Sequence, residues 1–183
     1  MCGIAGYVGD RESADVLVDA LSKLEYRGYD SAGIAVFDHG NIKVKKCKGR
    51  LANLVEKMDE EGKPQGHVGI GHTRWATHGE PSDINSHPHG NKRVTIVHNG
   101  IIENYKKLKD FLIGEGYSFA SETDTEVAAK LLDYYYDGDP MKTIAKVLSE
   151  IKGSYALGIM FRDFPDEIFA VLLLLVLENM RIS

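Results

Sequence analysis

The chain has 183 residues, of which 43% are hydrophobic and 27% are charged, and it carries a net charge of −5. This length and composition predict one soluble globular domain with a sizeable core, and the negative charge argues against nucleic acid or an anionic membrane as a partner. The two cysteines, Cys2 and Cys47, are too few for a disulfide framework, which favours a reduced, cytoplasmic setting. The chain starts without the segments of a signal peptide, and its longest apolar run, residues 168–177, is too short to cross a bilayer as a helix.

The first half of the chain alternates apolar strand-like runs with helical periodicity. Strands are expected at residues 2–8, 34–37, 42–44 and 68–75. The second and third of these form a hairpin around a turn at residues 38–41. Helices are expected at residues 14–24 and 51–58, where apolar side chains recur every three or four positions. A long polar loop over residues 76–92 follows, and a loop of that length is usually functional.

The second half predicts a strand, three helices and two closing strands. The strands are expected at residues 94–97, 155–161 and 168–173. The helices are expected at residues 104–116, 124–135 and 140–151. Thr123 and Glu126 form a capping box before the second helix, and Pro140 opens the third. Strands joined by hairpins, with helices between them, predict an α+β layered sandwich with mainly antiparallel sheets.

Cys2 carries the first chemical signal. When the initiator Met1 is removed, Cys2 presents a thiol and a free α-amine on adjacent carbons. The amine has an ordinary pKa of about 8 and the thiol of about 8.5, so one can accept the other's proton near neutral pH. Nucleophile and base then come from a single residue. The alternative is an incidental small residue in a buried first strand.

Three polar stretches lie where predicted strands or helices meet. Arg74 can hold a carboxylate through two parallel hydrogen bonds, and Asp124, in the first turn of a helix, can take an ammonium group. Asn99 offers an amide N–H, and the N–H of Gly100 follows in a turn, so the two can stabilise an oxyanion. A ligand with an α-carboxylate, an α-ammonium and a reactive carbonyl satisfies all three, and glutamine is such a ligand.

Each of these residues has a purely structural alternative. Arg74 could be a surface ion-pair residue, and Asn99-Gly100 is the commonest dipeptide of a hairpin turn. Asp124 could only favour the start of its helix electrostatically.

The histidines allow a further alternative, a metal site. A zinc site could use His78, His87 and His89, or a metal-binding module could add His72 to them. Their spacing matches no zinc pattern, so no metal and no cofactor are expected.

Several stretches together resemble one family. The opening Met1-Cys2-Gly3-Ile4 is shared by the class II glutamine amidotransferases. Tyr-Arg-Gly-Tyr-Asp-Ser-Ala-Gly at residues 26–33 and His-Thr-Arg-Trp-Ala-Thr-His-Gly at residues 72–79 resemble more specifically the glutaminase domains of the isomerising glutamine–fructose-6-phosphate aminotransferases. Asn-Ser-His-Pro at residues 85–88 and the stretches around Asn99 and Asp124 follow in matching order and spacing. The resemblance covers residues 1–171 of a single domain, 1–183.

The resemblance implies a four-layer αββα sandwich of the N-terminal-nucleophile hydrolase type. It implies that Cys2 attacks the side-chain amide of glutamine, that Asn99 and Gly100 form the oxyanion hole, and that Arg27 helps to order the site. Residues implied to bind glutamine are Arg74, Trp75, Thr77, His78, His87 and Asp124. The products would be glutamate and ammonia, formed through a thioester at Cys2.

In the complete enzymes of this family, which form homodimers, the ammonia would serve hexosamine biosynthesis. A C-terminal half binds fructose 6-phosphate and yields glucosamine 6-phosphate. That half has no counterpart here.

The tail at residues 172–183 does not resemble the family. Its four leucines, residues 172–175, suit a shifted reading frame or an altered sequence, with an ordinary apolar edge strand as the alternative. We therefore expect a domain truncated at its C-terminus, with apolar sheet surface that promotes association. The competing functional hypothesis is a catalytically silent module that binds glutamine without hydrolysing it.

Overall fold

A computed structural model describes residues 2–75 and 80–173. Its strands are β1 (Gly3–Val8), β2 (Ser31–Asp38), β3 (Asn41–Lys48), β4 (Val68–Arg74), β5 (His89–Gly90), β6 (Val94–Ile102), β7 (Gly153–Phe161) and β8 (Phe169–Leu173). Its helices are α1 (Ser13–Ser22), α2 (Leu51–Glu61), α3 (Tyr105–Gly114), α4 (Asp124–Tyr135) and α5 (Pro140–Glu150), with a 3₁₀ turn at Glu25–Arg27. Among the described residues, no helix is both long and apolar enough to cross a membrane.

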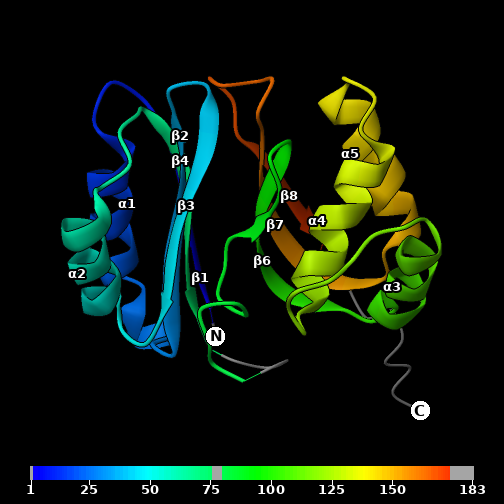
Figure 1. The fold of residues 1–183 in the computed structure, drawn as a ribbon, viewed down its shortest axis with the longest axis horizontal. Coiled ribbons are helices and arrows are strands. Elements are labelled where there is room, and N and C mark those ends of the chain that lie inside the picture. Colours follow the sequence, from blue (N-terminus) through cyan, green and yellow to red (C-terminus); the bar gives the residue numbers. More distant parts are fainter. Residues whose placement is uncertain (1, 76–79, 174–183) are drawn as a thin grey trace, which may run out of the picture.

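The elements form four layers (Figure 1). One sheet has the strand order β1-β4-β2-β3 and is covered by α1 and α2 on its outer face. The second has the order β5-β6-β7-β8 and is covered by α3, α4 and α5. Every strand pairing that the structure describes is antiparallel. The predicted αββα sandwich of the N-terminal-nucleophile hydrolase type is therefore confirmed.

Three apolar cores hold the layers together. The first lies between the outer helices α1 and α2 and the first sheet, and includes Leu17, Ile34 and Leu54. The second, the largest, lies between the second sheet and its helices. The third lies between the two sheets and includes Ile70 of β4 and Val97 of β6. Alternate side chains of a strand point to opposite faces, so each sheet supplies one face to the middle core and one to its helices.

The two predicted helix starts have the expected caps. The Thr123 hydroxyl accepts a hydrogen bond from the N–H of Glu126 at 3.2 Å, as in a capping box. The reciprocal bond is absent among the described residues, because the Glu126 carboxylate instead accepts from the N–H groups of Ala120 and Ser121. Asp139 caps α5 by accepting from Lys142 N at 3.0 Å, with Pro140 in the first position. Both caps are local, which explains why the sequence reveals them.

The expected turn at Asn99-Gly100 is wrong. β6 continues to Ile102, and it stays paired with β7 from Val94 opposite Phe161 to Ile102 opposite Gly153. Gly100 has a φ of +113°, and a Cβ there would lie 2.1 Å from the carbonyl oxygen of Ser154. The dipeptide is thus a distortion inside a strand that only glycine tolerates. Long-range pairing with β7 overrides the local turn preference.

The described part of the predicted polar loop, residues 80–92, has more regular structure than expected. It contains β5, which pairs with β6, and Asn85, Ser86, His87 and Pro88 are buried. Burial is possible because side chains and backbone groups elsewhere satisfy the polar groups of this segment.

Candidate active site

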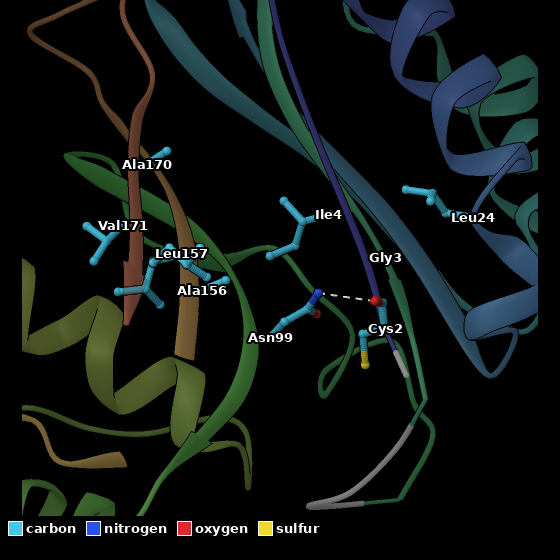
Figure 2. A pocket seen from close by; sticks show the side chains of 10 residues that line it. Cys2, Gly3, Ile4, Leu24, Asn99, Ala156, Leu157, Ala170 and Val171 are labelled. Carbon is cyan, nitrogen blue, oxygen red and sulfur yellow. Dashed lines mark hydrogen bonds between the residues drawn. The ribbon is translucent and has the colours of Figure 1, made fainter. Parts of the chain in front are cut away.

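Cys2 lies at the edge of the inter-sheet space, beside residues from β4 and β6. Its sulfur accepts a hydrogen bond from the N–H of Trp75 at 3.1 Å. Its carbonyl oxygen accepts one from the side-chain amide of Asn99 at 3.1 Å. Figure 2 shows Asn99 reaching toward the Cys2 main chain from the facing sheet. The pairing of β1 with β4 sets Gly3 opposite Thr73, which brings the start of the chain to the end of β4.

The environment of Cys2 disfavours the free thiolate. Burial raises the pKa of the Cys2 thiol, and the nearby Asp30 carboxylate raises it further, while the Trp75 hydrogen bond and Arg74 oppose them. A thiol in this state needs a base to become a nucleophile.

The side chain of Asn99 is fixed at both ends. Its oxygen lies 2.9 Å from Nε2 of His72, and its nitrogen donates to Cys2 O. Asn99 and Val97 project from β6 into the space between the sheets, whereas His98 projects toward α4, where its Nδ1 lies 2.9 Å from the Thr125 hydroxyl. An amide has two N–H groups, so one remains for a ligand.

Arg74 and Asp124 are both buried, at 4% and 6% exposure. The structural alternative for Arg74, a surface ion pair, is therefore wrong. Asp124 is the first residue of α4, and its Oδ2 accepts from the N–H of Ile102 at 2.9 Å. This bond ties the start of α4 to the end of β6. Asp124 thus has a structural role, and its Oδ1 lies 3.5 Å from the Thr125 hydroxyl and 3.8 Å from Nδ1 of His98.

The segment that carries His87 is held from both sides. The ammonium of Lys46 donates to the carbonyl oxygens of Ile84, Ser86 and Pro88 at 3.2, 2.7 and 3.2 Å. Burial lowers the pKa of Lys46 to about 8. On the other side, Asn85 accepts from the N–H of Glu122 at 3.1 Å. Gly33 admits the segment, because a Cβ there would lie 2.1 Å from His87 O.

Four histidines gather between β4, β6 and α4. The ring centroid of His87 lies 4.1 Å from that of His72, 5.0 Å from that of His89 and 6.5 Å from that of His98. Burial lowers the pKa of His72 to about 3 and those of His87 and His89 well below 6.5. The rings of His72, His87 and His89 are therefore neutral. Across residues 2–75 and 80–173, no group of His, Cys, Asp or Glu is arranged to hold a metal ion.

A cavity of about 430 Å³ opens beside Cys2 and Asn99. Its other lining residues are mainly apolar and come from β1, β7 and β8, among them Ile4, Leu157 and Val171, with Leu24 from the segment after α1 (Figure 2). This volume lies within the range of small-molecule sites. Arg74 and Asp124 do not line it.

The structure brings together most of the residues singled out in the sequence. Cys2, Asn99, Trp75, Arg74, Asp124 and His87 all belong to one contiguous region at the ends of β4 and β6. Thr77 and His78 lie outside the described residues, as does the tail beyond Leu173. Arg27 belongs to the 3₁₀ turn before β2.

The sequence offers a role for His72 only in a metal site, and no sequence pattern indicates a role for Lys46 or Thr125. A two-residue alternation along β4 could have found His72. Val68 and Ile70 belong to the inter-sheet core. Because side chains alternate between the two faces of a strand, His72 and Arg74 lie on the same face of β4 as Val68 and Ile70.

Comparisons with known proteins agree with this geometry. Residues 72–171 match the family described as "Glutamine amidotransferase domain". Over 93% of its length, the chain is 59% identical to the isomerising glutamine–fructose-6-phosphate aminotransferase of Caldanaerobacter subterraneus and 57% identical to that of Clostridium tetani. It spans 28% of the length of each of these curated relatives. Among solved structures, 88% of the chain superposes on 35% of the glutamine phosphoribosylpyrophosphate amidotransferase of B. subtilis, with 29% identity and a TM-score of 0.76.

Proposed function

The chain belongs to the glutamine amidotransferase domain family, and from this premise we propose that it hydrolyses L-glutamine to glutamate and ammonia. The hydrogen bond between Asn99 and Cys2 is the observation that carries the proposal. It joins Cys2, the candidate nucleophile, to an amide donor suited to an oxyanion.

In the proposed reaction, the α-amine of a processed Cys2 accepts the thiol proton, and the sulfur forms a bond to the δ-carbon of glutamine. Negative charge develops on the amide oxygen, where Asn99 and Gly100 donate hydrogen bonds. The carbon–nitrogen bond then breaks, and the amine returns the proton to the departing ammonia. Water hydrolyses the γ-glutamyl thioester, which releases glutamate and restores the thiol.

We assign the binding of the substrate's charged groups to Arg74 and Asp124. The Arg74 guanidinium would hold the α-carboxylate, and its burial supports this because a buried charge gains more from a charged partner than an exposed one. Oδ1 of Asp124 would hold the α-ammonium group. Trp75, Thr77, His78 and His87 would complete the pocket, with Arg27 ordering the segment beside Cys2.

The names of the relatives suggest where the ammonia goes. In a complete enzyme, it would be transferred to fructose 6-phosphate to yield glucosamine 6-phosphate, within a cytoplasmic homodimer. This chain would supply only the glutaminase half of that reaction.

The function can be tested by incubating the protein with glutamine and with a glutamine analogue that carries an electrophilic carbon in place of the amide. We expect glutamate release, and a single label that peptide mapping assigns to Cys2 rather than to Cys47. The buried position of Cys47, at 6% exposure, makes it the internal control. Glutamine binding by calorimetry without glutamate release would instead support a silent binding module.

Arg74→Lys should raise the KM for glutamine about 10- to 100-fold while changing kcat less. Lysine keeps the positive charge but loses the paired hydrogen bonds to a carboxylate, and a bond to a charged group contributes about 1.5–3 kcal/mol in both ground and transition state. Steady-state kinetics measure the two constants. Arg93→Lys is the matched control, because Arg93 pairs with Asp133 on the far side of the second sheet. An unchanged KM in Arg74→Lys would remove Arg74 from the binding site.

A further inference from the structure

His72 contacts Asn99, the residue that donates a hydrogen bond to the candidate nucleophile Cys2. Its side chain is 1% exposed and lies in the space between the sheets. Its Nε2 lies 3.0 Å from the carbonyl oxygen of His98 and 2.9 Å from Oδ1 of Asn99. Both partners belong to β6, so the ring of His72 bridges from β4 to the facing sheet.

The partners determine where the ring carries its proton. A backbone carbonyl and an amide oxygen are both acceptors, so Nε2 must be the protonated nitrogen and donate to them. Burial lowers the pKa of His72 to about 3, so the ring is neutral and Nδ1 has no proton. Nδ1 has no hydrogen-bond partner among the described residues. All hydrogen bonding of this side chain is therefore directed through Nε2 at β6.

This donor decides which way the amide of Asn99 faces. The oxygen and nitrogen of an asparagine amide are nearly the same size, so packing alone does not distinguish its two orientations. With the N–H of His72 on one side, only the oxygen can face His72. The nitrogen is then turned toward Cys2, where it donates to the carbonyl oxygen at 3.1 Å.

We propose that His72 is a positioning residue that holds the Asn99 amide with its N–H groups toward the nucleophile. The proposal rests on the proposed function, since an oriented donor matters only if an oxyanion forms there. The ring itself is held in place by the neighbouring His87, whose ring centroid lies 4.1 Å away at an interplanar angle of 32°. His72 does not touch the substrate in this account and acts only through Asn99.

Two variants separate the donor from the bulk of the side chain. His72→Phe fills the space without an N–H, and His72→Gln can place an amide N–H near the position of Nε2. Loss of one oxyanion donor lowers kcat by about 10²–10³-fold, so we expect His72→Phe to lower kcat about 10- to 100-fold with little change in KM. His72→Gln should restore most of the loss. His67→Phe, at an exposed histidine, is the control and should retain wild-type kinetics.

A double-mutant cycle tests whether His72 acts through Asn99. In an Asn99→Ala background, His72→Phe should lower kcat no further, because the amide that it orients is gone. Alkylation of Cys2 by iodoacetamide forms no oxyanion, so its rate should be the same in wild type and His72→Phe. Additive losses, a parallel fall in alkylation, or full activity of His72→Phe would each overturn the proposal.

A measurement without turnover separates this inference from the proposed function. Nuclear magnetic resonance of ¹⁵N-labelled protein should show His72 with its proton on Nε2 and a side-chain amide signal of Asn99 that shifts in His72→Phe and returns in His72→Gln. Those shifts would support the positioning role even if the wild type released no glutamate, a result that would contradict only the proposed function. Unchanged Asn99 signals, or a proton on Nδ1, would refute the positioning role in an active enzyme.

Discussion

Cys2→Ala is expected to lower glutamate release by about 10³-fold or more, because the nucleophile and its covalent intermediate are lost while binding residues remain. The fold should be retained. Cys2 is half-buried, and its side chain loses the hydrogen bond from the N–H of Trp75 and the longer one to the Trp75 carbonyl oxygen, each a contribution of about 1 kcal/mol or less. Glutamate assays measure the first effect and thermal unfolding the second. In wild-type protein quenched during turnover, mass spectrometry should find the γ-glutamyl adduct on Cys2.

The second cysteine provides the control for this experiment. Cys47 lies in β3 and packs in the core between the first sheet and its helices. Cys47→Ala should retain the activity and cost about 1 kcal/mol of stability through the lost packing. Full glutaminase activity in Cys2→Ala would exclude the thioester mechanism.

The same mechanism makes activity depend on removal of Met1, because only then is the free N-terminal α-amine that of Cys2. Met1 lies outside the described residues, so mass spectrometry must establish the state of each preparation. Hydrolysis by chains that retain Met1 would mean that another group takes the thiol proton.

Acidification from pH 7.5 to 5.5 is expected to lower the free energy of unfolding by about 4 kcal/mol through three buried histidines. His72, His87 and His89 have pKa values far below the ordinary 6.5 because burial disfavours the charged ring. Above pH 6.5 these rings are neutral in both states and have no effect. Below it, the unfolded chain binds protons that the native rings do not, so stability falls as the pH falls, by about 1.4 kcal/mol per pH unit for each ring.

Urea unfolding at a series of pH values measures this dependence. Carboxylates such as Asp38 do not titrate between pH 7.5 and 5.5, because the pKa of Asp38 is lowered to about 2, chiefly by the hydrogen bond from Gln65 N. His89→Gln should reduce the slope by about one third, whatever its effect on stability at neutral pH. Equal stability at pH 7.5 and 5.5 would show that the native rings accept protons.

The elements themselves were largely predictable from local patterns. Apolar spacing identified α1, α2 and α5 to within a few residues, and the caps at Thr123 and Asp139 fixed two helix starts. Such features depend on residues less than one turn apart, so their physical cause is contained in the sequence window itself. The pattern of residues around Cys2, Arg74 and Asn99 likewise pointed to amide chemistry.

Only the tertiary structure decided how these parts meet. Asn99-Gly100 has the local preference of a turn, yet continued pairing with β7 holds it inside β6. The sequence was compatible with an exposed ion pair at Arg74, but the folded structure buries this residue. His72 and Asn99 are separated by 27 positions in the chain, and no short-range pattern encodes their contact. The sequence by itself determined the types of the elements and which reactive side chains are present. The packing of the two sheets determined which of these side chains share one site. Contacts across layers depend on strand order and register rather than on local propensity.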